Sequence, residues 1–114
     1  MIKNIRKRDG RVVEFTEEKI TNAIFKAAES IGGHDKETSK KLANKVITIL
    51  EYKHDANDTP TVEEVQDIIE RVLIKTGHAK TAKAYILYRN QHKKLREAKS
   101  TFIDAQNTIN SYLR

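Results

Sequence analysis

Cations gather near the beginning of the chain in a pattern that suits the binding of phosphate groups. Lys7, Arg8 and Arg11 flank the dipeptide Asp9-Gly10, and Lys19 follows shortly afterwards. A phosphate group needs several converging donors, because one exposed ion pair contributes only about 0–1 kcal/mol. The cluster holds more positive charge than a short hairpin needs for folding. We therefore interpret it as a candidate polyanion site.

A β-hairpin and a helix start are expected to position these cations. Asp9-Gly10 is typical of a two-residue turn that supplies positive φ, so residues 2–7 and 11–15 are predicted to pair as antiparallel strands. Thr16 is predicted to cap the following helix with its side chain, which places Lys19 in the first helical turn.

The same strands offer a surface for a purine base. Backbone amide and carbonyl groups can read a base edge without a particular side chain. Ile5, Val12 and Val13 are candidates for the apolar walls of such a pocket. Packing of the strands against the core is the alternative role for these three side chains.

The rest of the chain is predicted to form four helices with short connections. The residues assigned to buried faces are Ile20, Ile24, Ala27 and Ile31, then Leu42, Val46 and Ile49, then Val65, Ile68 or Ile69, and Val72. Gly32-Gly33 ends the first helix. Thr61 and Glu64 form a capping box for the third helix. The fourth helix is expected to end near Lys99, before a separate weakly amphipathic segment. These elements predict an α+β, mostly α fold, in which a small β-hairpin or sheet caps a four-helix bundle and a C-terminal helical linker follows.

A second group of cations stands near the end of the fourth predicted helix. Its members are Arg89, His92, Lys93, Lys94 and Arg96. For Lys94 and Arg96, a favourable interaction with the helix C-terminus is the simpler explanation. Arg89, which follows Tyr88, is better placed to reach a ligand than Lys94 and Arg96. Tyr88 and Arg89 are both candidate ligand contacts, and core packing is an equal alternative for Tyr88.

Composition limits the classes of function. The 114 residues fit one domain, and the net charge of +6 with a pI near 9.6 favours anionic partners such as nucleotides, nucleic acids or acidic protein surfaces. The lack of cysteine excludes disulfides, thiolate zinc sites and thiol nucleophiles. No histidine spacing suits a metal, and no nucleophile elbow, Walker loop or pair of carboxylates in an apolar setting occurs. No run of residues is apolar and long enough to span a membrane. We expect a cytoplasmic protein with no membrane partner and no catalytic residues in this chain.

Three motifs together resemble the ATP-cone domain. The first comprises residues 5–15 (IRKRDGRVVEF) followed by Lys19-Ile20-x-x-Ala23-Ile24, the second residues 60–67 (PTVEEVQD), and the third residues 82–89 (AKAYILYR). They occur in the family's order and cover about residues 1–96. ATP cones are regulatory nucleotide-binding modules of ribonucleotide reductases and of a bacterial repressor of reductase genes.

The resemblance implies a site between the hairpin and the helices that senses ATP against dATP. Lys7 and Arg8 would contact phosphates, Lys19 would contact phosphate from the first helix, and Val12 and Val13 would border adenine. A glutamate that reads adenine in some relatives aligns with Val13. A histidine of some reductase cones aligns with Gln66, which can hydrogen-bond to ribose or phosphate.

The resemblance also implies partners. The allosteric ligand would be ATP or dATP, with Mg²⁺, and the catalytic domain of the same enzyme would be switched through a nucleotide-modulated homo-oligomer. Residues 1–98 would form the cone, and residues 99–114 the linker or the start of the catalytic region. That tail resembles anaerobic ribonucleoside-triphosphate reductases, although a cobalamin-dependent reductase is an open alternative. A nucleotide-responsive transcription regulator or a basic nucleic-acid-binding domain is the rival function. The repressor's zinc ribbon would need cysteines, and we do not expect a nucleic-acid partner.

Overall fold

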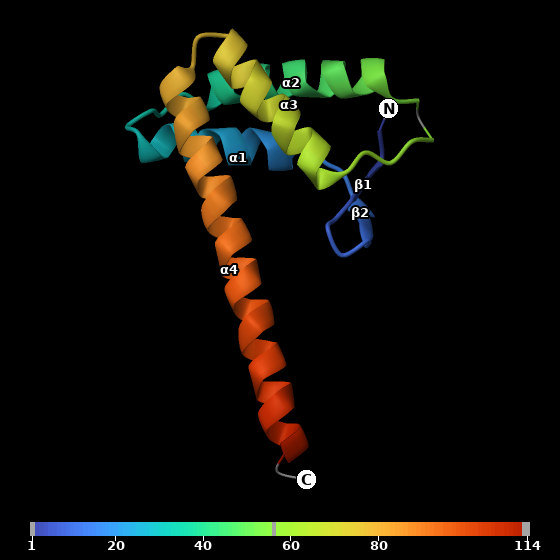
Figure 1. Cartoon of the computed structure of the whole chain (residues 1–114). Helices are drawn as coiled ribbons and strands as arrows, with labels where there is room; N and C mark the ends of the chain where they lie inside the picture. The colour runs from blue at the N-terminus through green and yellow to red at the C-terminus, as the bar shows by residue number, and fades with distance from the viewer. Residues whose placement is uncertain (1, 56, 113–114) are drawn as a thin grey trace.

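The computed structural model describes residues 2–55 and 57–112. The elements are β1 (Asn4–Arg6), β2 (Val12–Glu14), α1 (Glu17–Ser30), α2 (Lys36–Lys53), α3 (Val62–Lys75) and α4 (Ala79–Tyr112). Figure 1 shows a small antiparallel hairpin beside four helices, the last of which is much longer than the others. The prediction of an α+β, mostly α fold with a hairpin cap is confirmed.

The core lies among the helices. α1 packs on α2, α2 on α3, α3 on the first part of α4, and α4 on α1, which closes a four-membered ring of contacts. The predicted apolar faces of α1, α2 and α3 point into this ring, except that Ile49 of α2 is only partly buried, and both Ile68 and Ile69 are buried. Ile31 is an exception, because α1 ends at Ser30 and Ile31 is 47% exposed outside the helix. The assignment of Ile31 to the buried face was therefore wrong.

The hairpin turn is one residue longer than predicted. The Gly10 N–H donates to the Lys7 carbonyl at 2.9 Å, and the Lys7 N–H donates to the Arg11 carbonyl at 2.8 Å. A two-residue type I′ turn needs positive φ at both central residues, whereas only Gly10 has it, at 88°. The turn therefore has the three-residue form, a type I turn closed by a left-handed glycine.

The hairpin is attached to the segment that connects α2 to α3. The Arg6 N–H donates to the Pro60 carbonyl at 2.9 Å, and Arg6 forms a parallel bridge with Thr61. At the turn, Arg8 Nε lies 2.7 Å from Glu63 Oε1 in the first turn of α3. Because an isolated two-stranded hairpin is marginally stable in water, these contacts fix its position.

Two helix caps differ from the predicted form. Thr16 occupies the N-cap of α1, but its side chain makes no capping hydrogen bond. Thr61 does cap α3, since its Oγ1 accepts from the Glu64 N–H at 3.1 Å. The Glu64 carboxylate, however, lies 2.8 Å from His54 Nε2 and so ties the end of α2 to the start of α3. Only one half of the predicted capping box is formed in this way.

α4 is a single helix from Ala79 to Tyr112, where a helix ending near Lys99 and a separate segment were predicted. No glycine or proline interrupts this stretch, so nothing in the sequence forces a break. All side chains of residues 90–101 are exposed, because the helix leaves the bundle (Figure 1). The amphipathic pattern predicted for the tail falls on side chains outside the described part. None of the helices in that part is apolar and long enough to cross a membrane.

The link between α2 and α3 depends on pH. The hydrogen bond to Glu64 raises the pKa of His54 above its ordinary value of 6.5, and the charge of Asp58 acts in the same direction. A folded-state pKa above the unfolded value means that protonation favours the folded state. This stabilisation is complete below the unfolded-state pKa and is lost as the pH rises through the folded-state pKa.

We therefore expect His54→Gln to lower the free energy of unfolding more at about pH 5.5 than at about pH 8.5. Urea denaturation at both pH values measures this difference. His34→Gln, which replaces an exposed histidine between α1 and α2, is the control and should have little effect at either pH. An equal loss at both pH values would contradict a charged His54–Glu64 pair.

Candidate functional site

A cleft of about 340 Å³ lies between the tip of the hairpin, the start of α3 and the middle of α4. Its lining residues are Lys7, Arg8, Asp9, Arg11, Val62 and Arg96. Four of the six are cations and one is a carboxylate, so the cleft is strongly positive. Such a concentration of charge from separate elements suits a ligand with several negative charges.

Two of the four cations are paired within the protein. Arg8 Nε lies 2.7 Å from Glu63, and Arg11 Nε lies 2.7 Å from Asp9. Within the described part of the chain, Lys7 and Arg96 form no ion pair. Because exposed pairs are worth only about 0–1 kcal/mol, an anionic ligand can compete for the arginines as well as contact the lysine.

Asp9 organises the turn. Its carboxylate accepts from the Arg11 N–H at 3.0 Å and from Arg11 Nε at 2.7 Å. The backbone hydrogen bond from Arg11, followed by the side-chain one, holds the pKa of Asp9 below its ordinary value. Asp9 therefore stays ionised at neutral pH and fixes Arg11 at the rim of the cleft.

The three predicted wall residues of a base pocket lie on two faces of the hairpin. Ile5 pairs with Val13, and Arg6 pairs with Val12. Ile5 packs against the core, whereas Val12 is 49% exposed on the opposite face. Neighbouring residues of a strand point to opposite sides, so Val12 and Val13 do not present one continuous surface.

Three other predicted contacts stand outside the lining of the cleft. Lys19 Nζ lies 3.5 Å from the Glu14 carbonyl, at the far end of β2. Tyr88 packs its ring against His92, with 4.2 Å between ring centroids. Arg89 Nη1 lies 2.8 Å from Asp67 and 2.9 Å from Glu70, so it joins α4 to α3.

Gln66 has an unusual environment. Its Oε1 is buried and has no hydrogen-bond partner among the described residues. Gln66 follows Val62 by one helical turn, so the two residues lie on the same side of α3. An unpaired buried acceptor costs about 1–3 kcal/mol, so a donor supplied by a ligand would remove this penalty.

Arg96 is the site residue that sequence reasoning missed. It lines the cleft from α4, although an interaction with the helix terminus was the preferred explanation for it. That explanation required α4 to end soon after Arg96, whereas the helix continues to Tyr112. The uninterrupted helical composition of residues 79–112 was the available signal.

Comparison with known proteins gives the family of this chain. The family model described as the ATP cone domain matches residues 3–94. The chain belongs to the ATP-cone family. The match spans the hairpin, the first three helices and the half of α4 that packs on the bundle. The recognition made from the three sequence motifs is confirmed.

Several relatives of this ATP cone are ribonucleotide reductases. A vitamin B12-dependent ribonucleoside-diphosphate reductase of Thermoplasma acidophilum is 43% identical over 104 residues, which are 87% of this chain and 13% of that protein. The alpha subunit of a Chlamydia muridarum ribonucleoside-diphosphate reductase is 33% identical over 99 residues, 80% of this chain and 10% of that protein. An anaerobic ribonucleoside-triphosphate reductase of Haemophilus influenzae is 32% identical over 98 residues, 82% of this chain and 13% of that protein. The chain thus spans about an eighth of the length of such relatives or less.

Arg89 provides a test of whether this end of α4 has a structural or a ligand-binding role. We expect Arg89→Ala to lower the free energy of unfolding by about 1–2 kcal/mol, because Asp67 and Glu70 lose charge-assisted hydrogen bonds. Denaturant unfolding measures this loss, and Arg71→Ala on the exposed side of α3 is the control. Unchanged stability combined with a lost affinity for ATP would point instead to direct contact between Arg89 and the ligand.

Proposed function

We propose that this ATP cone binds ATP or dATP in the cleft at the hairpin tip. Through that ligand it would control the overall activity of a ribonucleotide reductase of which it forms part. The observation that supports this proposal is the convergence of Lys7, Arg8, Arg11 and Arg96 from the hairpin and from α4. Allosteric nucleotide regulation is the role that membership of the family implies.

The triphosphate would bind to the cations of the cleft. Lys7 and Arg96, which have no ion-pair partner among the described residues, offer charges on two sides, and Arg8 can exchange Glu63 for a phosphate oxygen. Guanidinium groups suit this role because their planar donors bind two phosphate oxygens at once. Mg²⁺ would arrive with the nucleotide, since it binds mainly through phosphate oxygens and water. Lys19 stays a candidate for a further phosphate contact from α1.

The nucleoside would lie between the hairpin and α3. Val62 supplies an apolar contact in the cleft. Gln66 lies one helical turn behind Val62 and outside the lining of the cleft, so its side chain would turn toward the nucleotide for Oε1 to accept a hydrogen bond from a ribose hydroxyl. ATP and dATP differ only at the 2′-hydroxyl, and one neutral hydrogen bond contributes about 0.5–1.5 kcal/mol. The isolated cone would therefore discriminate between the two nucleotides weakly.

Regulation would act through α4, because the cleft uses a side chain from the part of that helix that leaves the bundle. A nucleotide that holds Arg96 against the hairpin favours one direction of α4 over others. The catalytic domain and further copies of the enzyme would be sensitive to that direction. The strength of the switch is set by the difference in affinity of the nucleotide for the two arrangements.

Removal of the phosphate contacts tests the site. We expect Lys7→Ala combined with Arg8→Ala to weaken ATP binding by several kcal/mol, since charge-assisted hydrogen bonds contribute about 1.5–3 kcal/mol each. Arg96→Ala alone should lose one such contribution, and Lys93→Ala, on the exposed part of α4, should lose little. Isothermal titration calorimetry with and without Mg²⁺ provides the measurement. Undiminished ATP affinity in the double variant, with circular dichroism unchanged, would refute the phosphate assignment.

Gln66 gives a second test because stability and affinity should change in opposite directions. We expect Gln66→Leu to raise the free energy of unfolding by up to about 1–3 kcal/mol, since a buried unpaired acceptor is removed. The same variant should bind ATP more weakly and dATP unchanged, and so lose a preference that we expect to be about tenfold or less in the parent. Equal losses for both nucleotides would place Gln66 away from the 2′-hydroxyl.

A further inference from the structure

A separate groove of about 580 Å³ runs between α2 and α3 and plays no part in the proposed nucleotide site. Lys45 and Lys53 line it from α2, and Arg71 and Lys75 line it from α3. No carboxylate is among its lining residues. Within the described part of the chain, none of these four cations forms an ion pair. The groove therefore presents four uncompensated positive charges.

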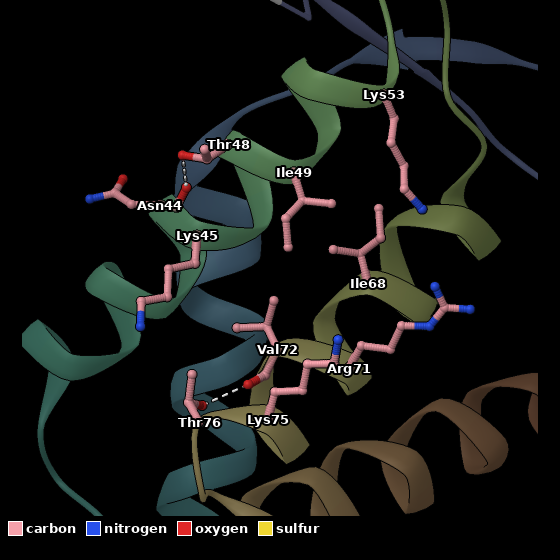
Figure 2. A pocket seen from close by; sticks show the side chains of 10 residues that line it. All are labelled: Asn44, Lys45, Thr48, Ile49, Lys53, Ile68, Arg71, Val72, Lys75 and Thr76. Atoms are coloured by element: carbon pink, nitrogen blue, oxygen red, sulfur yellow. Dashed lines mark hydrogen bonds between the residues drawn. The ribbon is translucent and has the colours of Figure 1, made fainter.

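The floor between the cations is apolar. Figure 2 shows Ile49 of α2 facing Ile68 of α3 across the groove, with Val72 farther along α3 and the charged side chains around them. Ile68 and Val72 belong to the buried core, and Ile49 is partly buried against it. The aliphatic stems of the lysines extend this apolar strip while their ammonium groups remain in solvent.

The spacing of the cations favours an elongated ligand over a small anion. Lys45 and Lys53 are eight residues apart, which is about 12 Å along α2. The charges thus lie along the groove and do not converge on one point, as a phosphate group would require. An amphipathic helix has the matching form, because its apolar stripe repeats every three or four residues with charged residues on both sides.

The chemistry of the groove selects the charge of that helix. Four unpaired cations with no carboxylate require acidic residues on both flanks of the apolar stripe. The exposed part of α4 (residues 90–101) from a second copy of the chain is a poor candidate for the occupant. It carries one acidic residue, Glu97, and four cations, which are Lys93, Lys94, Arg96 and Lys99. No aromatic side chain lines the groove, so it offers nothing on which nucleic-acid bases could stack.

We propose that the α2–α3 groove is a docking site for an acidic amphipathic helix from outside this chain. Ile49, with Ile68 and Val72 beneath it, contacts the apolar stripe of the helix, and the four cations pair with its flanking carboxylates. Most of the recognition is electrostatic, so the interaction is weak and sensitive to salt. The groove gives the domain a second surface for a partner, independent of the nucleotide cleft.

The test uses the full chain and a fluorescein-labelled helical peptide of about 20 residues, with leucines at helical spacing and glutamates on both flanks. Fluorescence anisotropy should show saturable binding that weakens as salt increases. Lys45→Glu combined with Lys75→Glu should raise the dissociation constant at least about tenfold. Lys93→Glu combined with Lys94→Glu changes the total charge equally outside the groove and should have a much smaller effect.

Further controls decide between this proposal and simple charge attraction. A scrambled peptide of the same composition, without an apolar stripe, should bind at least about tenfold more weakly. Equal binding of the scrambled peptide would overturn the proposal, as would tighter binding of a single-stranded oligothymidylate to the same groove. ATP at saturation should leave peptide affinity unchanged, and competition by ATP would place the peptide at the hairpin instead. Circular dichroism of each variant establishes that the fold is retained.

Discussion

The attachment of the hairpin to the α2–α3 connection is the contact on which the candidate nucleotide site depends. Two strands of three residues each cannot hold a fixed position alone. The backbone hydrogen bond from Arg6 to Pro60 places the hairpin tip beside the start of α3. Glu63 and Val62 follow directly in that helix, so this attachment and the Arg8–Glu63 ion pair together set the distance between the hairpin cations and α3. The cap of α3 and the hairpin are therefore a single structural unit.

Ion pairs within the cleft affect selectivity. Arg8 and Arg11 are each paired with a carboxylate before any ligand binds. A singly charged anion would gain little by replacing such a partner, whereas a triphosphate can compensate several cations at once. The pairs also hold the guanidinium groups near the positions in which they would bind phosphate. This reduces the side-chain entropy lost on binding. Partial neutralisation of the cleft thus favours multiply charged ligands over common monovalent anions.

Sequence patterns predicted the elements well, because they follow from local periodicity and capping residues. The hairpin, the four helices and most of the buried faces were readable in this way. The predictions failed where a local sequence pattern is compatible with two structures and contacts elsewhere in the fold decide between them. The Asp9-Gly10 dipeptide suits either of two turn lengths, and Ile31 fits the helical period but lies beyond the last turn. At the site, composition could have shown that α4 continues past Arg96, but the sequence could not show that Arg96 meets the hairpin, because this depends on where the hairpin is attached.

The continuous helix α4 joins the helical bundle to the candidate nucleotide cleft. Its first turns pack against α1 and α3, and Arg89 holds it to Asp67 and Glu70. The side chains of residues 90–101 are exposed, and among them Arg96 lines the candidate nucleotide cleft. A helix fixed at one end and held by a ligand two turns later has little freedom to change direction. Replacement of the ligand by one that contacts Arg96 differently would change the direction of α4. A small change at the hairpin can therefore become a larger displacement at the far end of the helix.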